Sequence, residues 1–299
     1  MHDVIIVGGG PAGLSAALVL GRCRRSVLLV DAGRPRNAVT ERMYGYLGHD
    51  GRPPGELRAL ARTELEQYPT VECRDGEVTD ARREEDGFAV VLADGRTERA
   101  RRLILATGLA TALPDVEGFS EYWGRGVHHC PYCDGFENRD GPLVVYGKGE
   151  GGKGLALELT AWSRDLTLCT DGRAEALSDG DRDRLARQRI RLDERPVARL
   201  EGAEGRPARL RFADGEALPC RALFFAPAAC APSSLIERLG CTLTPKGTVP
   251  TREYEQSNVP GLYVAGDASR RVQFAIVAAA EGAMAAFAIN TELLQEDTR

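Results

Sequence analysis

Three features are missing from this 299-residue sequence: an excess of one charge, a long uncharged apolar run, and a second set of paired metal ligands. The net charge is −5, and the basic residues are scattered rather than gathered in one tract, which argues against a nucleic-acid partner. No apolar run reaches the roughly 18 residues of a membrane span, because the closest, 274–289, contains Glu281. We therefore expect neither a nucleic-acid nor a membrane partner.

Little chain precedes the first apolar stretch. An apolar strand pattern starts directly after residues 1–3, which leaves no space for the charged and apolar regions of a signal peptide. We expect a cytoplasmic protein, in which most thiols are reduced and a disulfide tends to be catalytic. The length fits two domains, and 43% hydrophobic with 28% charged residues fits an α/β enzyme.

A strand, a glycine loop and a helix follow one another at the N-terminus. Apolar residues 4–7 lead into the loop 8–13, and a helix-period stretch covers 14–20. In such a unit Gly8 permits a tight turn, Gly10 lets the backbone approach a pyrophosphate, and Gly13 lets the helix pack closely on the strand. Asp31 ends the next strand, where its carboxylate can bind a ribose hydroxyl. The pattern predicts a dinucleotide site.

A second copy of this plan begins at 143–146, with a glycine loop at 147–152 and a helical stretch at 155–162. The loop also matches the start of a P-loop, but Gly154 stands where that motif needs a hydroxyl for Mg²⁺. We therefore favour a second dinucleotide-type loop.

The repeat extends beyond the glycine loops. A strand, a turn and a closing strand occur at 88–105 and again at 210–225, in the same register. The C-terminal strand 262–264 and the apolar helix after it lack a sheet of their own, so we assign them to the first domain. The expected fold is α/β, with two Rossmann-like, three-layer domains: a discontinuous first domain at 1–113 and 246–299, and an inserted second domain at 114–245.

Cys130 and Cys133 stand in a different context from the six isolated cysteines. They lie in the sequence His-His-Cys-Pro-Tyr-Cys-Asp-Gly at 128–135, and cysteines at this spacing can close a small ring with one acidified thiol. A zinc site with the adjacent histidines is an alternative, but structural zinc usually draws on two ligand pairs, and the other histidines are only His2 and His49. Inert core cysteines are a further alternative. Redox chemistry is the interpretation we favour, with no metal.

The collinear order of these motifs resembles the low-molecular-weight thioredoxin reductase family over essentially the whole chain. The motifs that carry the resemblance are the two glycine loops, Ala106-Thr107-Gly108, Cys130-Pro131-Tyr132-Cys133-Asp134-Gly135 and Gly266-Asp267-Ala268. The resemblance implies FAD in the first domain, a pyridine-nucleotide-type second domain, a cysteine pair that faces the flavin in one domain arrangement, and a homodimer.

The resemblance also implies roles for individual residues. Cys133 corresponds to the thiol nearest the flavin, Cys130 to the one that exchanges with substrate, and Asp134 to the general acid. Asp267 corresponds to the residue that binds the ribityl chain, and Gln273 to one near the isoalloxazine ring. The cofactor-binding residues expected in this way are Gly8, Gly10, Pro11, Ala12, Gly13, Asp31, Ala106, Thr107, Gly108, Gly266, Asp267 and Gln273.

One departure from the family concerns the electron donor. NADPH-using members end the second strand of the inserted domain in His-Arg-Arg, with another Arg later, whereas this chain has Thr170, Asp171, Gly172 and then Ala176. A carboxylate at Asp171 would repel a 2′-phosphate and at best suits NAD. The alternative is that Arg173 or a neighbouring arginine supplies the charge from another direction. NADPH is therefore not the preferred donor in our hypothesis, and binding of NAD(P)H is doubtful.

The chain also resembles the flavin dithiol oxidases that close disulfides in gliotoxin- and holomycin-type natural products. His129 directly precedes the first cysteine, as in that group, and an imidazole there is suited to take a proton from an incoming thiol. Asn37 corresponds to a polar residue of that group that could orient the histidine. Asp134 instead matches the reductases, since some members of the dithiol oxidase group have His at this position. The alternative is that His128 and His129 are exposed polar residues flanking a loop.

These features lead to a functional hypothesis. His129 activates a thiol of a small-molecule dithiol, which attacks the disulfide at Cys130, and the electron pair passes through Cys133 to FAD and then to O₂, which leaves as H₂O₂. The alternative is a reductase of a thioredoxin-like protein, supplied by NADPH or a ferredoxin-type donor. A flavin-bound redox sensor is a third, non-enzymatic possibility.

Overall fold

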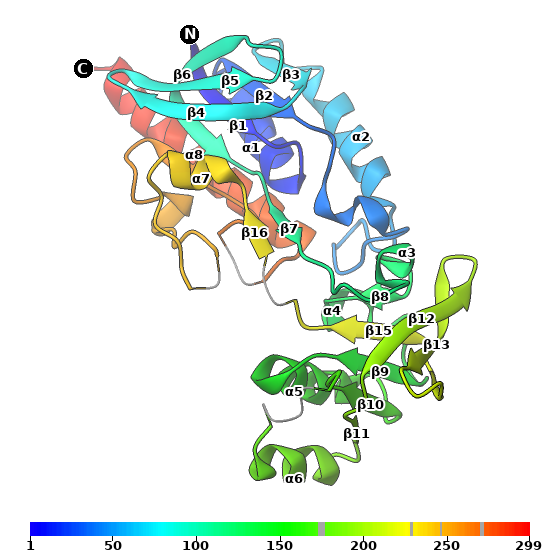
Figure 1. Ribbon diagram of the computed structural model, residues 1–299. Coiled ribbons are helices and arrows are strands. Elements are labelled where there is room, and N and C mark those ends of the chain that lie inside the picture. Colours follow the sequence, from blue (N-terminus) through cyan, green and yellow to red (C-terminus); the bar gives the residue numbers. More distant parts are fainter. Residues whose placement is uncertain (173–176, 228–229, 246, 270–271) are drawn as a thin grey trace. The chain divides into compact units, whose positions relative to one another are not determined.

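The computed structural model describes residues 1–172, 177–227, 230–245, 247–269 and 272–299, and the side chains of 230–232 are outside this description (Figure 1). The chain forms two compact units. Unit 1 comprises Met1–Ala38, Gly45–Thr111 and Ala229–Arg299, and unit 2 comprises Val39–Tyr44 and Ala112–Ala228.

Unit 1 is built on a seven-stranded sheet in the order β3-β2-β1-β6-β5-β4, with β17 paired to β6. Strands β3, β2, β1, β6 and β17 run parallel, and β4 and β5 add an antiparallel ribbon to β6. The strand bounds are β1 His2–Val7, β2 Val27–Asp31, β3 Val71–Asp75, β4 Val78–Glu84, β5 Gly87–Leu92, β6 Thr97–Leu105 and β17 Leu262–Val264. β7 (Leu109–Thr111) pairs with β16 (Cys230–Pro232) in a separate two-stranded sheet.

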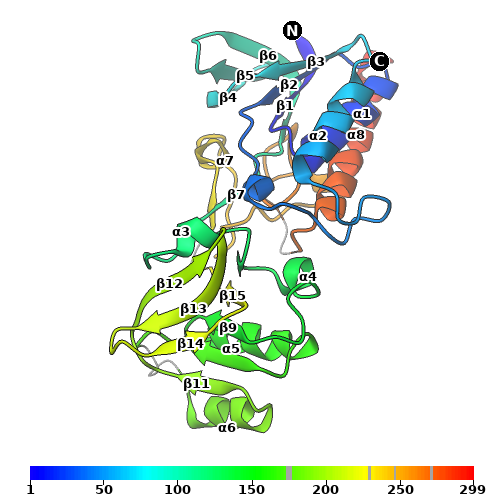
Figure 2. The ribbon, with the colours of Figure 1, turned by 90° about the vertical axis from the view of Figure 1, so that its right-hand side faces the viewer.

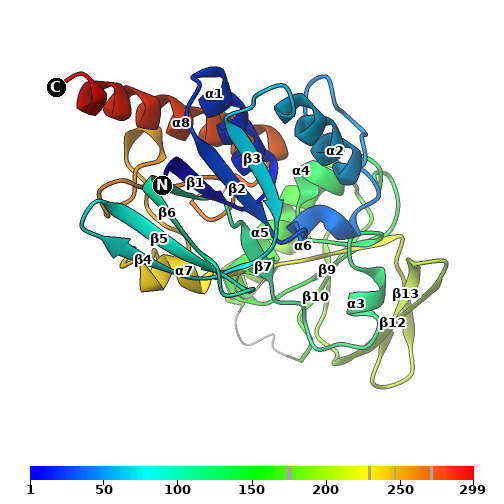
Figure 3. The same cartoon turned by 90° about the horizontal axis from the view of Figure 1, so that it is seen from above.

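Helix α8 (Ala275–Asp297) lies beside α1 (Pro11–Arg22) on this sheet, as Figure 2 and Figure 3 both show. The two backbones touch, since a Cβ added at Gly282 would lie 1.9 Å from the carbonyl oxygen of Ala12. The remaining helical elements of this unit are η1 Arg36–Val39, α2 Pro54–Leu65, α7 Ser234–Arg238 and η4 Glu253–Glu255. Apolar side chains of α1, α8 and the parallel strands form one continuous core.

By length and composition alone, α8 is apolar enough to cross a membrane, contrary to the expectation that no segment reaches that length. Such a test is also passed by core helices of water-soluble proteins, and α8 has the contacts of one. Glu281, the seventh residue of this helix, is buried and accepts a 2.6 Å hydrogen bond from the backbone N–H of Gly266. The carboxylate is therefore satisfied inside unit 1.

Unit 2 is built on a five-stranded parallel sheet in the order β11-β10-β9-β15-β8, with a three-stranded antiparallel sheet, β12-β13-β14. The strand bounds are β8 Val127–His128, β9 Leu143–Tyr146, β10 Leu166–Cys169, β11 Arg191–Asp193, β12 Val197–Ala203, β13 Arg206–Phe212, β14 Ala217–Pro219 and β15 Ala222–Phe225. The helical elements are α3 Phe119–Tyr122, α4 Pro131–Asp134, α5 Gly149–Glu158, η2 Leu159–Ala161 and α6 Asp179–Arg187.

The predicted α/β class, with two Rossmann-like units and the second inserted in the first, is confirmed. The second crossing differs from the expected position at residue 245, because the segment from 229 onward belongs to unit 1. The physical reason is apolar packing: Leu235 and Ile236 of α7, and Leu239 directly after it, are buried in the core that also contains Phe88 and Leu92 of β5. The short segment Val39–Tyr44 belongs to unit 2 instead.

The close approach of α8 to α1 leads to a prediction about the stability of unit 1. A methyl group at Gly282 has no room against the Ala12 backbone, so Gly282→Ala should lower the free energy of unfolding by about 2 kcal/mol. Gly55→Ala, in helix α2 of the same unit, is the matched control, because nothing lies within 4 Å of the added Cβ. Urea unfolding followed by circular dichroism measures both, and equal effects of the two substitutions would contradict the packing.

Candidate active site

Cys130 and Cys133 form a disulfide across the single turn of α4, with their Cα atoms 5.3 Å apart. Cys130 is the N-cap residue and Pro131 occupies the first helical position, where the missing N–H costs no hydrogen bond. The backbone N–H of Cys133 donates to the Sγ of Cys130 at 3.2 Å. The sequence folds locally into a turn that holds the two sulfurs together and gives one of them a fixed donor.

His128 contacts the acid that follows this disulfide. Its Nδ1 lies 3.2 Å from Oδ1 of Asp134, and the two side chains are 8% and 19% exposed. Strand β8 fixes the ring, which lies 5.4 Å from the ring of Phe224 on the neighbouring strand β15. The interpretation of His128 as an exposed polar residue was therefore wrong. In the sequence, only the place of His128 directly after the apolar Val127 pointed to its burial.

His129, the predicted base, is half-buried in unit 2, with its ring 5.5 Å from that of Trp123. Asn37, the residue proposed to orient it, is half-buried in η1 of unit 1. His129 and Asn37 belong to different units, so their proposed pairing stays a prediction. Asp134 is oriented by His128, a contact that the sequence did not reveal.

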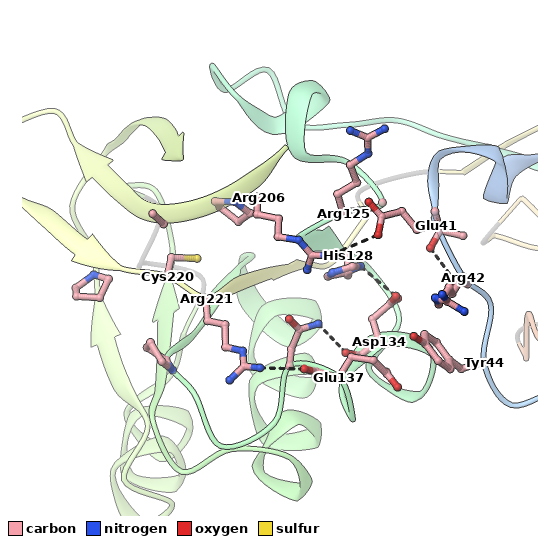
Figure 4. Close-up of a pocket in the computed structure, with 17 residues that line it drawn as sticks. Glu41, Arg42, Tyr44, Arg125, His128, Asp134, Glu137, Arg206, Cys220 and Arg221 are labelled. Carbon is pink, nitrogen blue, oxygen red and sulfur yellow. Dashed lines mark hydrogen bonds and ion pairs between the residues drawn. The ribbon is translucent and has the colours of Figure 1, made fainter. Parts of the chain in front are cut away.

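A cavity of about 490 Å³ lies within unit 2 and reaches the His128–Asp134 pair (Figure 4). Its other charged lining residues are Glu41, Arg42, Arg125, Glu137, Arg206 and Arg221. Arg206 pairs with Glu41 at 3.4 Å, and the side chains of that ion pair are 66% and 59% exposed. The cavity thus connects this acid–base pair with a charged surface.

The first glycine loop has the close contacts that its sequence predicts. Gly8 has a positive φ of 111°, and a Cβ there would lie 2.3 Å from the carbonyl oxygen of Ala106. A Cβ at Gly13 would lie 1.9 Å from the carbonyl oxygen of Gly8. Nothing lies within 4 Å of a Cβ at Gly10, so the space beside the start of α1 is open, as a pyrophosphate would need. The buried hydroxyl of Thr107 has no protein partner, which also fits a bound group.

Asp31 ends β2 and is buried in unit 1. Burial alone raises the pKa of its carboxyl, but the N–H groups of Gly33 and Gly9 and the guanidinium of Arg58 outweigh it and hold that pKa below its ordinary value. Arg58 and Arg62 reach Asp31 from α2, which the sequence gave no reason to expect. The carboxylate is therefore charged at neutral pH and ready to accept a hydroxyl hydrogen bond.

Arg36 joins three segments of unit 1, and the resemblance assigns two of them, at Asp267 and Gln273, to the flavin or its surroundings. Its guanidinium donates to Thr111 Oγ1 at 2.7 Å, to Asp267 Oδ2 at 3.3 Å and to the side-chain oxygen of Gln273. Burial raises the pKa of Asp267, and Arg36 opposes this rise. Sequence reasoning selected Asn37 in this loop and missed Arg36, although Arg36 is the residue that holds Asp267 and Gln273 together.

The turn at Gly266-Asp267-Ala268 follows β17 directly. Gly266 has a positive φ of 84°, and its N–H is held by the buried Glu281 of α8. Ser269 donates to the same carboxylate at 3.3 Å. Glu281 therefore fixes the turn that presents Asp267, and the sequence showed it only as an acid inside an apolar helix. The glycine contacts, the unpartnered Thr107 hydroxyl and this turn together fit FAD, which the residues predicted above would hold.

The second glycine loop closes on itself, since a Cβ at Gly147 would lie 2.8 Å from Cα of Gly152. Asp171 stands beyond the end of β10, and both of its carboxylate oxygens are engaged. One accepts from the Tyr146 hydroxyl at 2.7 Å and the other from the Val197 N–H at 2.8 Å. Arg173, the alternative source of positive charge, and Ala176, which stands where the family has a further Arg, lie outside the described residues.

The remaining cysteines whose side chains the structure describes divide into two groups. Cys23 and Cys73 are exposed, whereas Cys169, Cys220 and Cys241 are buried. Burial raises the pKa of the Cys220 thiol to about 12, so this thiol is not a nucleophile near neutral pH. Among the described residues, no group of three or more His, Cys, Asp or Glu side chains could hold a metal ion. The Cys130–Cys133 pair is the disulfide of the described chain.

Comparisons with known proteins agree with this geometry. A family model described as pyridine nucleotide-disulphide oxidoreductase matches residues 2–282. Thioredoxin reductase tcpT of Claviceps purpurea is 33% identical over 98% of this chain and 95% of its own length. Thioredoxin reductase sirT of Leptosphaeria maculans is 30% identical over 99% and 96%. The crystal structure of HlmI superposes with a TM-score of 0.95 at 37% identity, covering 99% of this chain and 94% of HlmI.

The contacts of Arg36 predict its contribution to cofactor binding. Arg36→Met removes the cation beside the buried Asp267 and releases Gln273, so we expect the affinity for FAD to fall about tenfold. Arg34→Met is the matched control, because Arg34 lies in the same loop but forms an exposed ion pair with Glu77. Fluorescence titration of the apoprotein with FAD measures both dissociation constants. Unchanged FAD binding in Arg36→Met would contradict this assignment.

Proposed function

This chain belongs to the pyridine nucleotide-disulphide oxidoreductase family, and we propose that within it the protein oxidises a small-molecule dithiol to an intramolecular disulfide, with O₂ as the acceptor. Family membership makes it an FAD-dependent oxidoreductase that acts on sulfur groups. The identity of the substrate and the direction of electron flow are the proposed part.

The direction of electron flow rests on Asp171. An NADPH-dependent reductase must bind the nucleotide, and NADPH-using relatives bind its 2′-phosphate with cations at this place in the inserted domain. In this chain a carboxylate stands there, fixed by Tyr146 and Val197. Its negative charge opposes a phosphate dianion, and neither oxygen can turn away without losing its partner. We therefore infer that electrons enter from a dithiol and not from NADPH.

The proposed exchange uses the disulfide of α4. A substrate thiolate attacks Cys130 Sγ, the Cys130–Cys133 bond breaks, and Cys133 leaves as a thiolate. The second substrate thiolate then attacks the substrate sulfur of the mixed disulfide, which forms the product disulfide and releases Cys130. The N–H of Cys133 donates to Cys130 Sγ and stabilises the charge that develops there. His129 is the proposed base for the substrate thiol, with Asn37 as its proposed partner.

The balance of the cycle is two electrons and two protons. The dithiol loses both, and the cysteine pair gains them in its reduced form. FAD, held by the residues named above, would supply the two-electron acceptor between the cysteine pair and O₂, and O₂ with the two electrons and two protons gives H₂O₂. Within unit 1, Arg36 holds Asp267 and Gln273 in place for that cofactor.

Reduction of a thioredoxin-like protein is the second candidate. The similarity to tcpT and sirT, which are both named thioredoxin reductases, favours it. The donor would be NADPH or a ferredoxin-type partner. For either function we propose a cytoplasmic homodimer, by analogy with the family.

Oxygen uptake with dithiothreitol as the model dithiol tests the proposal. Cys130→Ser should abolish uptake, since no disulfide remains to attack. His129→Ala should slow it about a hundredfold at neutral pH, because a general base commonly contributes that much. Cys23→Ser, which changes an exposed free thiol, is the control and should leave the rate unaltered. If Cys130→Ser or His129→Ala consumes oxygen like the unsubstituted protein, the proposed function is wrong.

A further inference from the structure

We propose that His128 is a positioning residue that orients Asp134 and passes protons between this acid and water in the cavity of unit 2 (Figure 4). The inference rests on the proposed thiol–disulfide exchange at Cys130–Cys133 and adds a proton route to it.

His128 is held in one orientation. Strand β8 pairs its backbone with Phe224 of β15, and the two rings lie 5.4 Å apart. With a side chain 8% exposed, the imidazole has little freedom to rotate, and its Nδ1 faces the Asp134 carboxylate at 3.2 Å. Nδ1 therefore donates to the carboxylate, which leaves Nε2 as the nitrogen that can exchange a proton.

The backbone of Asp134 is held at the end of α4. Its N–H donates to the carbonyl oxygen of Cys130 at 3.2 Å, and its own carbonyl oxygen accepts from Asn138 Nδ2 at 2.8 Å. The residue directly follows Cys133 in the chain. The fold thus connects the redox turn to a buried histidine through one carboxylate.

The cavity supplies the route to water. Its volume of about 490 Å³ is ample for several water molecules, and charged side chains line it. The charged groups facing the pair are Arg42, Arg125, Arg206, Arg221, Glu41 and Glu137. His128 lines the cavity, so a proton can pass between its ring and the water there.

The proton balance is as follows. When the Cys130–Cys133 bond breaks, the departing sulfur carries a negative charge. His128 passes its Nδ1 proton to Asp134 while its Nε2 takes a proton from cavity water, and Asp134 delivers the proton it has received to that sulfur. When the disulfide forms again and the electron pair leaves the cysteines, the proton returns by the same route. Each cycle leaves His128 and Asp134 in their original states.

Two substitutions separate orientation from proton transfer. His128→Asn keeps an N–H close to the position of Nδ1, so it can still orient Asp134, but it does not titrate. His128→Phe keeps a ring beside Phe224 and loses both functions. His2→Asn is the matched control, since His2 lies in β1 of unit 1 and pairs with Glu98.

The assay uses the FAD-loaded protein without oxygen. Dithiothreitol is added at a series of pH values between about 6 and 9, and alkylation after timed intervals measures how fast Cys130 and Cys133 become reduced. In the unsubstituted protein and in His2→Asn, the rate should have the same pH profile, to which His128 and the proposed base His129 both contribute. His128→Asn should lose the contribution of His128 to that profile and react about tenfold more slowly, and His128→Phe should react about a hundredfold more slowly.

A pH profile of His128→Asn that superposes on that of the unsubstituted protein overturns the proposal. If His128→Phe does not fold, the Asn variant alone decides the question. If the unsubstituted protein shows no thiol exchange, both the proposed function and the role of His128 are rejected. If exchange is normal but no oxygen is consumed afterwards, only the oxidase function is rejected.

Discussion

The disulfide across one turn of α4 is the constraint on which the site of unit 2 depends. Closing the ring places Cys130 at the helix N-cap and directs the N–H of Cys133 at its sulfur. It also places Asp134 at the end of the turn, where the carboxylate meets His128. A redox pair, a donor and an acid–base pair therefore arise from one local segment and the strand before it.

Unit 1 depends on a different constraint, the contact of backbone with backbone. Gly13 allows α1 to lie against the loop that begins at Gly8, and Gly282 allows α8 to lie against Ala12. This close packing buries Glu281, which has an N–H partner at Gly266 and therefore remains satisfied. The same carboxylate fixes the turn that carries Asp267, so the packing of the core determines where the cofactor-binding side chains lie.

The sequence predicted what is encoded locally. Both glycine loops, the repeat of units and the Cys130–Cys133 pair follow from short spacings, and the structure has them. Arg36 was missed because its role depends on a contact between distant segments; Arg36 and Asp267 are 231 residues apart in the chain. Glu281 and His128 were missed because only the fold shows that their carboxylate and ring meet Gly266 and Asp134. The second boundary was misplaced because only the folded core shows that α7 and β5 share one apolar cluster.

The central claim is that electrons reach the bound flavin from a dithiol through Cys130 and Cys133. Anaerobic mixing of the FAD-loaded protein with dithiothreitol, NADH or NADPH, followed by flavin absorbance, tests it most directly. We expect dithiothreitol to bleach the flavin in a reaction that Cys133→Ser abolishes, while NADPH at the same concentration leaves the absorbance unchanged over that time. Faster bleaching by NADPH than by the dithiol would contradict the claim.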